Sequence, residues 1–151
     1  MKQLKDRLKL TSDINDSKSA VVHILFSNMG IKEALTEQLK PYDLSIEQFN
    51  VLRILRGQNG KPLNLQDINE RMVAKSSNTT RLVDKLIDKS FTKRKPSKSN
   101  RRKVDVSITA KGLEVLKTLD PLIDKAEMKV TENLNDKEIR QLNKLLAKLN
   151  V

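Results

Sequence analysis

Apolar side chains recur every three or four positions along much of the chain, which is the spacing of amphipathic helices. The first such stretch runs from about Ser17 to Leu39 and includes Val21, Met29 and Leu35 among its apolar positions. Proline lacks a backbone N–H and disfavours helix before it, so this helix is predicted to end before Pro41. The pattern predicts one long helix near the N-terminus.

Three shorter helices are predicted to follow, each opened by a side chain that can accept a hydrogen bond from a first-turn amide. The predicted caps and partners are Ser45 with Gln48 in a capping box, Asn64 with Asp67, and Ser76 or Ser77. The predicted ends lie near Arg56, Met72 and Lys89. The third and fourth helices are joined by a short connection, and such a pair is a candidate helix-turn-helix.

Two strands are predicted after the fourth helix, at Phe91–Pro96 and Val104–Thr109. The second alternates apolar and polar residues, with Val106 at its centre on the apolar face. The loop between them, Ser97–Arg102, is polar and basic. A helix-turn-helix followed by a hairpin with a basic tip is the element order of a winged helix.

Two further helices are predicted to close the chain. One spans about Ala110 to Val130 and is expected to be interrupted or kinked at Pro121, and the other opens with Asn135 and Glu138 as a capping box. The last helix carries an apolar stripe at Ile139, Leu142, Leu145, Leu146 and Leu149. We expect part of this stripe to pack on the first helix and the rest to be buried in a homodimer. The predicted fold is mainly α, with about six helices and a β-hairpin wing.

Charge is concentrated in one part of the sequence. The chain has 151 residues and a formal net charge of +11, and eight basic residues without an acidic one lie between Lys89 and Lys103. A local potential of this size favours nucleic acid as the partner over a merely solvated loop. Anionic lipid is a weaker alternative, because these residues do not form an amphipathic helix with large apolar anchors.

Composition argues against several other classes of protein. Cysteine is absent and His23 is the only histidine, so no thiol chemistry, zinc site or other cofactor is expected. No Gly-rich phosphate loop or Ser–His–Asp set is present, so the chain is not expected to be an enzyme. No apolar stretch approaches the roughly 18 residues of a membrane span, and no secretory signal is visible. We expect a cytoplasmic protein without a membrane partner.

The fourth predicted helix has a polar arc that could read DNA. This arc holds Ser77, Asn78, Arg81, Asp84 and Lys85, opposite an apolar arc that includes Leu82 and Leu86. Asparagine can bind adenine and arginine guanine through paired hydrogen bonds, whereas Ser, Thr and Lys suit phosphates. For this helix alone an ordinary solvated face is the better interpretation, but the neighbouring basic hairpin favours DNA.

The segments Thr80–Leu86, Asn100–Arg102 and Ser107–Gly112, with Arg94 between them, resemble the MarR family of winged helix-turn-helix transcription regulators. The resemblance covers essentially the full chain, and its most specific part is the wing with its Ile-Thr-x-x-Gly exit. It implies a homodimer with interlocked terminal helices, recognition helices in major grooves and wings in adjacent minor grooves. The implied regions are dimerisation helices at 1–40 and 110–151 and a DNA-binding lobe at 41–109.

The chain departs from the family pattern at three positions. Asn100 stands where members usually carry an Asp that braces the wing through Arg, and an amide cannot form that ion pair. Ser90 and Val73 stand where members usually or often have Gly, which implies turns without an easy left-handed residue. The role of the wing arginine transfers to Arg102, with Arg101 as a neighbour of similar chemistry.

The resulting hypothesis is a transcription regulator that binds a pseudo-palindromic operator in double-stranded DNA as a homodimer. A repressor is favoured over an activator. The candidate contacts are Asn78 and Arg81 to bases, Ser76, Ser77, Thr80 and Lys85 to phosphates, and Lys98, Arg101 and Arg102 in the wing.

Relatives often bind small anionic or aromatic effectors. The candidate lining residues here are His23, Phe26, Phe49 and Arg53. For each of these residues, core or surface filling is the better interpretation. The alternative function is a winged-helix adaptor that binds protein without operator specificity. RNA is disfavoured because no aromatic residue lies among the basic residues of the wing.

Overall fold

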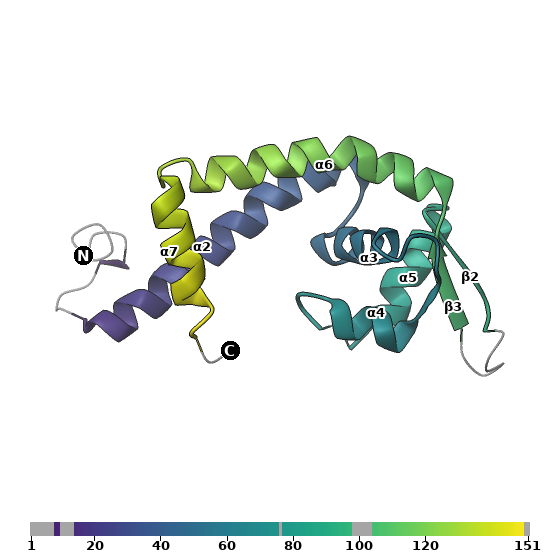
Figure 1. Ribbon diagram of the computed structural model, residues 1–151, viewed down its shortest axis with the longest axis horizontal. Coiled ribbons are helices and arrows are strands. Elements are labelled where there is room, and N and C mark those ends of the chain that lie inside the picture. Colours follow the sequence, from purple (N-terminus) through teal and green to yellow (C-terminus); the bar gives the residue numbers. More distant parts are fainter. Residues whose placement is uncertain (1–7, 10–13, 76, 98–103, 150–151) are drawn as a thin grey trace.

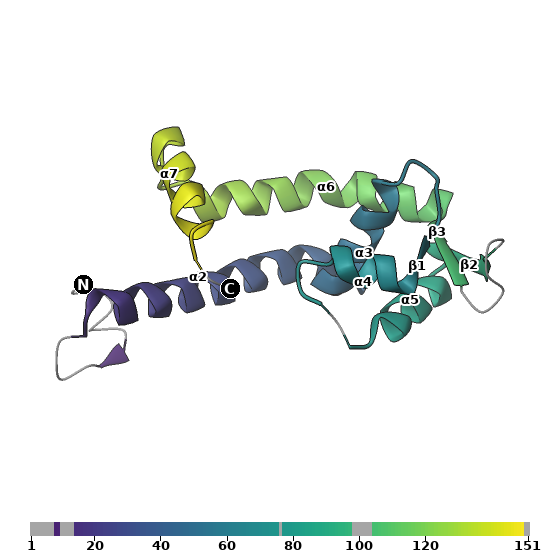
Figure 2. The ribbon, with the colours of Figure 1, turned by 60° about the horizontal axis from the view of Figure 1, so that its bottom comes forward.

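Two long helices form an arm that projects from a lobe of short helices and strands (Figure 1). The computed structural model describes residues 8–9, 14–75, 77–97 and 104–149. Helix α2 (Asp16–Leu39) lies beside helix α6 (Ala110–Thr131), and α7 (Asp136–Leu146) follows the end of α6 that lies away from the lobe. The start of α2 extends beyond α7. Figure 2 shows α7 standing away from α2, and no residue of α7 is buried. The expectation that part of the α7 stripe packs on the first helix is therefore wrong for the single chain.

Helix α6 continues through Pro121, so the predicted interruption is wrong, while the alternative of a kink there stays a prediction. A proline within a helix removes one hydrogen bond to the residue four positions earlier, but its fixed φ is compatible with helical backbone. The flanking residues Leu119 and Ile123 are both buried. We attribute the continuity of α6 to this packing on either side of the proline.

The predicted caps of the second and third helices are confirmed. In α3 (Ile46–Arg56), Gln48 N donates to Ser45 Oγ at 3.2 Å and Ser45 N donates to Gln48 Oε1 at 2.9 Å. Asn64 caps α4 (Leu65–Arg71) by accepting a hydrogen bond from Asp67 N at 2.9 Å. Between α2 and α3 the chain passes through a short 3-10 helix, η1 (Lys40–Tyr42).

The fourth helix, α5 (Thr79–Asp88), starts later than predicted and has a different cap. Asn78 Oδ1 accepts the hydrogen bond from Arg81 N at 3.3 Å, so the prediction of Ser77 as cap is wrong. Ser76 lies outside the described residues. Several consecutive polar residues could cap this helix, and the point at which the backbone turns into it selects among them.

The predicted hairpin is confirmed as β2 (Thr92–Pro96) and β3 (Val104–Ile108), paired antiparallel with Arg94 opposite Val106. A third strand, β1 (Leu63–Asn64), pairs with the other edge of β3, so the sheet order is β1-β3-β2. A strand of only two residues shows no alternating pattern, so the sequence does not predict β1. Val106 at the centre of β3 is fully buried against the lobe.

The exit from the wing is fixed by Thr109, which caps α6. Its Oγ1 accepts a hydrogen bond from Gly112 N at 3.1 Å and donates to the Ser90 carbonyl at 2.7 Å. Ser90 itself adopts the left-handed conformation, with φ of +62°. The turn after α5 therefore keeps the geometry that usually favours glycine, although this chain has serine there.

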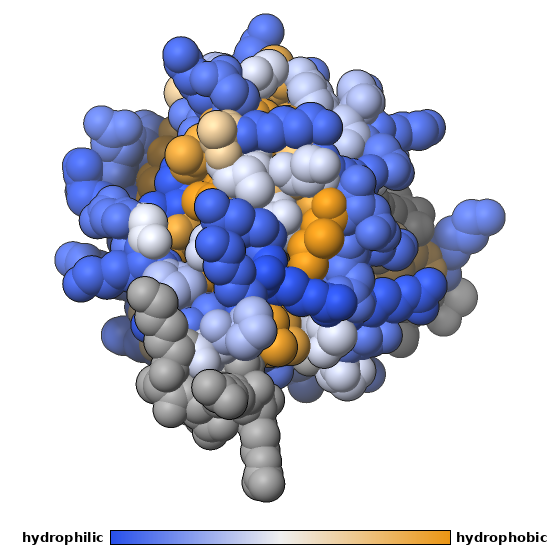
Figure 3. All heavy atoms as spheres, turned by 90° about the vertical axis from the view of Figure 1, so that its right-hand side faces the viewer, coloured by the Kyte–Doolittle hydropathy of each residue, from blue (hydrophilic) through white to orange (hydrophobic). Residues whose placement is uncertain are grey.

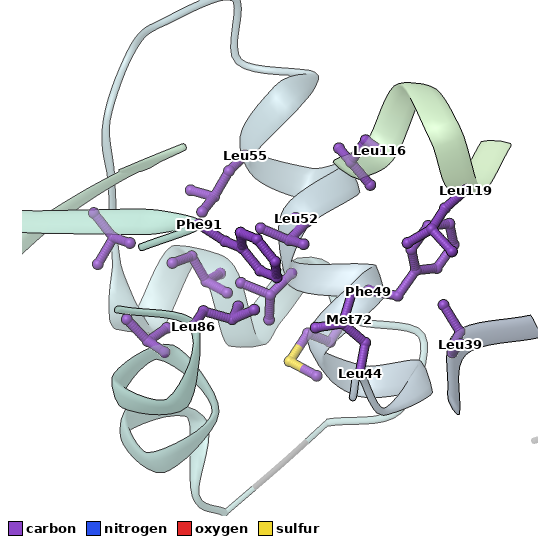
Figure 4. Packing of buried hydrophobic residues seen from close by; sticks show 14 of the residues in the cluster. Leu39, Leu44, Phe49, Leu52, Leu55, Met72, Leu86, Phe91, Leu116 and Leu119 are labelled. Atoms are coloured by element: carbon purple, nitrogen blue, oxygen red, sulfur yellow. The ribbon is translucent and has the colours of Figure 1, made fainter. Parts of the chain in front are cut away.

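The hydrophobic core lies where the lobe meets the arm, and Figure 4 shows its side chains converging from α3, α5 and α6. Leu52, Leu55 and Leu86 of the lobe pack in one cluster with Leu39 of α2 and Leu116 of α6.

An ion pair also joins α3 to α6. The Arg56 guanidinium pairs with the Asp120 carboxylate, and Arg56 Nη2 lies 3.3 Å from Asp120 Oδ1. The lobe is thus held to α6 by both apolar packing and a bidentate ion pair.

Candidate nucleic-acid interface

Helix α5 has one buried face and one solvent-facing side, as its 3.6-residue pattern predicts. Thr79, Val83 and Leu86 are buried, whereas Thr80, Arg81 and Lys85 are exposed. Ser77, just before the helix, is also exposed. The second helix of a helix-turn-helix commonly enters the major groove. Two cations and one hydroxyl of α5 are therefore available on its outer side.

Asn78 has a local role that the sequence did not reveal. Its Oδ1 accepts the capping bond from Arg81 N. Paired recognition of adenine requires the amide oxygen to accept and the nitrogen to donate. The oxygen would have to share its lone pairs between the helix and the base. The structure therefore gives Asn78 a capping function, and its contact with a base stays a prediction.

An ion pair joins the exposed side of α5 to the first strand of the wing. Arg94 Nη1 of β2 donates to Asp84 Oδ1 of α5 at 2.8 Å, and both side chains are about half exposed. Exposed pairs of this kind contribute at most about 1 kcal/mol to stability. The main consequence is geometric, because the pair fixes the wing strand relative to the helix and neutralises the only acidic residue of the predicted polar arc.

The strand β2 carries most of the described positive charge of the wing. Lys93, Arg94 and Lys95 are all exposed, and Lys93 and Lys95 lie opposite Ser107 and Asp105 of β3. The end of the molecule seen in Figure 3 is mostly hydrophilic, with small hydrophobic patches. The predicted wing contacts at Lys98, Arg101 and Arg102, and the family departure at Asn100, lie outside the described residues.

Charge at the C-terminal end of α5 is balanced within the lobe. Lys89 pairs with Asp43, and the hydrogen bond and charge of Lys89 lower the pKa of the Asp43 carboxyl. Lys111 Nζ donates to the Lys89 carbonyl at 3.0 Å and lies 5.4 Å from the centre of the Phe91 ring. A cation at a helix C-terminus is favourable because it faces unpaired carbonyls. These contacts attach the end of α5 to its neighbours.

A hollow lies between the start of α3 and the solvent-facing side of α5. Its volume is about 340 Å³, and it is lined by Ser45, Gln48, Asn78, Arg81, Leu82 and Lys85. The sequence predicts only a capping function for Ser45 and Gln48. Their position beside α5 is a tertiary relationship, and the capping pattern carries no signal for it.

The four predicted effector residues fall into two pairs on different helices. Phe49 is a core residue with 7% exposure, and the Arg53 guanidinium lies 5.7 Å from the centre of its ring. His23 is exposed and Phe26 is half-buried on α2. Phe49 thus has the core-filling position that its sequence context favoured.

The part of the chain that the structure describes contains no group of three or more His, Asp or Glu side chains arranged to hold a metal ion. None of its helices combines the length and hydrophobicity needed to cross a membrane.

Comparison with known proteins identifies the family. Residues 44–104 match the sequence model of the MarR family. The chain is 31% identical over 134 residues to the uncharacterized HTH-type transcriptional regulator YfiV of Bacillus subtilis (strain 168), covering 87% of this chain and 80% of that protein. The chain belongs to the MarR family. It is also 30% identical over 111 residues to the HTH-type transcriptional regulator TcaR of Staphylococcus aureus (strain Newman), covering 72% of each.

The fold agrees with this assignment to the MarR family. A mutant MarR from E. coli, crystallised in complex with operator DNA, superposes with a TM-score of 0.78 at 24% identity, covering 91% of this chain and 98% of that one. The described part of this chain is mainly helical with a three-stranded antiparallel sheet, and this is the arrangement that superposes. The predicted winged helix-turn-helix is therefore confirmed, and the relatives named here are transcription regulators rather than enzymes.

Proposed function

We propose that the protein is a homodimeric repressor that binds a pseudo-palindromic operator in double-stranded DNA. The observation that carries this proposal is the exposed side of α5, where Arg81 and Lys85 reach solvent on the helix that packs against the cationic strand β2. This arrangement presents positive charge from two adjacent elements to one side of the lobe. The operator complex of the E. coli MarR mutant supports the same use of the fold.

Exposed apolar residues on the arm support the homodimer. Large apolar side chains with at least 36% exposure occur on or next to α2, α6 and α7 at Val21, Ile24, Leu25, Met29, Ile31, Leu113, Met128, Val130, Leu134, Leu142, Leu145, Leu146 and Leu149. Apolar surface of this extent is typical of a protein interface. A second copy of the same arm offers a matching apolar surface through two-fold symmetry.

This arrangement assigns a task to each region of the chain. Residues 1–40 and 110–151 form the dimer, and residues 41–109 form the DNA-binding lobe. Arg81 and Asn78 contact bases, whereas Ser76, Ser77, Thr80 and Lys85 position the helix on phosphates. Lys98, Arg101 and Arg102 reach the minor groove. The two lobes of a dimer then occupy half-sites about one helical turn apart.

Release from the operator is assigned to a small anionic or aromatic effector. The candidate residues are His23, Phe26, Phe49 and Arg53, of which the exposed Arg53 is the natural partner for an anion. Binding to chromosomal DNA places the protein in the cytoplasm.

The decisive experiment is selection of bound fragments from a genomic DNA pool by the purified protein, followed by affinity measurements at several salt concentrations. We expect recovery of fragments that share an inverted repeat, with an affinity that falls steeply as salt rises. Light scattering of the same sample should give twice the chain mass. Binding without sequence enrichment, or no binding at low salt, would instead favour the protein-interaction adaptor.

A further inference from the structure

Asp84 places an acidic side chain on the side of α5 that is proposed to face DNA. Residues three apart are neighbours on a helix, so Asp84 lies beside Arg81, and it directly precedes Lys85. A carboxylate repels the phosphates of a duplex, so Asp84 on its own would weaken attraction to DNA of any sequence. The proposed function gives DNA contacts to both neighbouring cations and none to Asp84.

Asp84 is paired with the central cation of a basic strand. Arg94 Nη1 of β2 donates to Asp84 Oδ1 at 2.8 Å. Side chains alternate between the two faces of a strand, so Arg94 lies on the face toward α5, whereas Lys93 and Lys95 lie on the other. These two lysines are exposed and form no ion pair with the described residues, although Asp105 lies opposite Lys95 in the strand register. Of the three cations of β2, Arg94 is thus the one that a described acidic residue neutralises by direct contact.

The ion pair matters more for charge than for folding. The side chains of Arg94 and Asp84 are 55% and 45% exposed, and pairs as exposed as this contribute little to stability because water screens them. With the pair closed, the two groups add no net charge to the surface that meets DNA. Without the carboxylate, the Arg94 guanidinium would be free to bind a phosphate. Asp84 therefore controls whether β2 offers a cation on the side of α5.

We propose that Asp84 is a specificity-determining residue that keeps Arg94 from binding DNA phosphates. The inference rests on the proposed DNA-binding function and assigns a role to two residues that this function leaves without a contact. On DNA of unrelated sequence, attraction comes almost entirely from cations and phosphates, so the loss of one guanidinium weakens this complex. On the operator, base contacts fix the position of α5, and the closed pair keeps the wing strand attached to α5 in that position. Asp84 thereby widens the difference in affinity between the operator and other DNA.

The test is Asp84→Asn in the full chain, which keeps the size of the side chain and removes its charge. Binding is measured at several salt concentrations to the duplex recovered by genomic selection and to a scrambled duplex of the same length and composition. The variant should bind the scrambled duplex about fivefold to tenfold more tightly at about 0.1 M salt, as expected for one further phosphate contact. The slope of log affinity against log salt should steepen by about one unit. Affinity for the selected duplex should rise by less, so the ratio of the two affinities falls, while the thermal midpoint stays near the wild-type value.

Two further variants separate the release of Arg94 from a general charge effect. Asp88→Asn makes the same chemical change four residues later on α5, where the exposed Asp88 forms no ion pair with the described residues. It should strengthen binding to the scrambled duplex much less than Asp84→Asn does. In the double variant Asp84→Asn with Arg94→Gln, the gain should disappear, because the cation that makes the new contact is gone.

Three results would overturn the inference. An equal gain in Asp88→Asn would show that the general field explains the effect. A gain that persists in the double variant would show that Arg94 is not its source. An equal gain on the selected and scrambled duplexes would show that Asp84 does not determine specificity. Failure of the wild type to prefer the selected duplex would instead overturn the proposed function itself.

Discussion

The backbone at Gly112 lies directly against the carbonyl oxygen of Phe91. A Cβ atom at residue 112 would overlap that oxygen and would meet Ile108 Cγ1 at 2.8 Å. Thr109 N donates to the same Phe91 carbonyl at 3.0 Å, so this oxygen is fixed at the junction of the wing and α6. The glycine of the Ile-Thr-x-x-Gly exit is therefore required by close packing of two backbone segments.

Gly112→Ala should lower the free energy of unfolding by about 1–3 kcal/mol, because the methyl group meets backbone that cannot move aside. Urea denaturation followed by circular dichroism measures the effect. Gly30→Ala is the matched control, since nothing lies within 4 Å of a Cβ at that position in α2. In this control the free energy of unfolding should rise by about 0.5–1 kcal/mol, because alanine has a higher helix propensity than glycine. Equal effects of the two substitutions would contradict the packing argument.

Ser90→Gly should stabilise the protein by about 0.5–1 kcal/mol, because Ser90 has a φ of +62° that glycine adopts without a Cβ penalty. The hydrogen bond from Thr109 Oγ1 to the residue 90 carbonyl is unaffected by the side chain. Thermal denaturation provides the measurement. Ser27→Gly within α2 is the control and should destabilise by about 0.5 kcal/mol. A loss of stability in Ser90→Gly would show that the left-handed backbone of Ser90 is not unfavourable for serine.

The pair of Asp43 and Lys89 should make stability depend on pH in the acid range. The pKa of Asp43 is lowered below its ordinary value of 3.8 by Lys89, so the folded state binds the proton less readily than the unfolded state. Its contribution is present above that ordinary value and is lost as pH falls through the lower folded value. Asp43→Asn should therefore be less stable than wild type near neutral pH, with the difference disappearing at low pH.

The measurement is a series of urea denaturations from about pH 6 to about pH 2, the interval over which a carboxylate of this kind titrates. Asparagine tolerates the left-handed backbone that residue 43 adopts, with φ of +51°, so the substitution tests charge rather than conformation. Asp124→Asn on α6 is the control, because Asp124 makes no ion pair with the described residues. Parallel pH profiles for the two variants would exclude a specific role for the pair.

Arg81→Ala should weaken operator binding by about 1–3 kcal/mol and relax the preference at one base position. The reason is loss of paired hydrogen bonds to a base edge from the exposed side of α5. Fluorescence anisotropy with a set of single-base operator variants measures both effects. Arg140→Ala on α7 removes the same charge far from the lobe and should have little effect. Uniform weakening across all variants would show that Arg81 contacts only the backbone.

Leu145→Glu should convert the proposed dimer into a monomer, because Leu145 on α7 is 53% exposed and belongs to the apolar stripe. A charge buried at the interface would lack a partner. Light scattering measures the mass, and DNA binding should be lost with it. Val73→Glu changes an apolar residue that is 95% exposed but lies on the lobe, so its mass should not change. A dimeric Leu145→Glu variant would remove α7 from the interface.

The sequence predicts those parts of the fold that depend on local hydrogen bonds. The caps at Ser45, Asn64 and Asn135 were predicted correctly, because each involves residues within one turn. The start of α5 was predicted incorrectly, since Ser77 and Asn78 have similar capping chemistry and tertiary packing decides between them. The two residues of β1 are strand only because β3 lies beside them.

The candidate site shows the same division between local and tertiary information. Exposure of Arg81 and Lys85 follows from the helical period alone. The position of Gln48 beside Lys85 depends on how α3 crosses α5, which no pattern within either helix specifies. The ion pair between Asp84 and Arg94 likewise joins two elements whose arrangement is set by the core.

The unbroken course of α6 has a mechanical consequence. The helix has 22 residues, so it is a rod of about 33 Å that begins at the wing and ends shortly before α7. In a dimer joined at the arms, a tilt of about 5° between the two rods would move the two lobes by about 3 Å relative to each other, given that length. A break at Pro121 would absorb such a tilt, whereas a stiff rod converts it into a change in the separation of the two α5 helices.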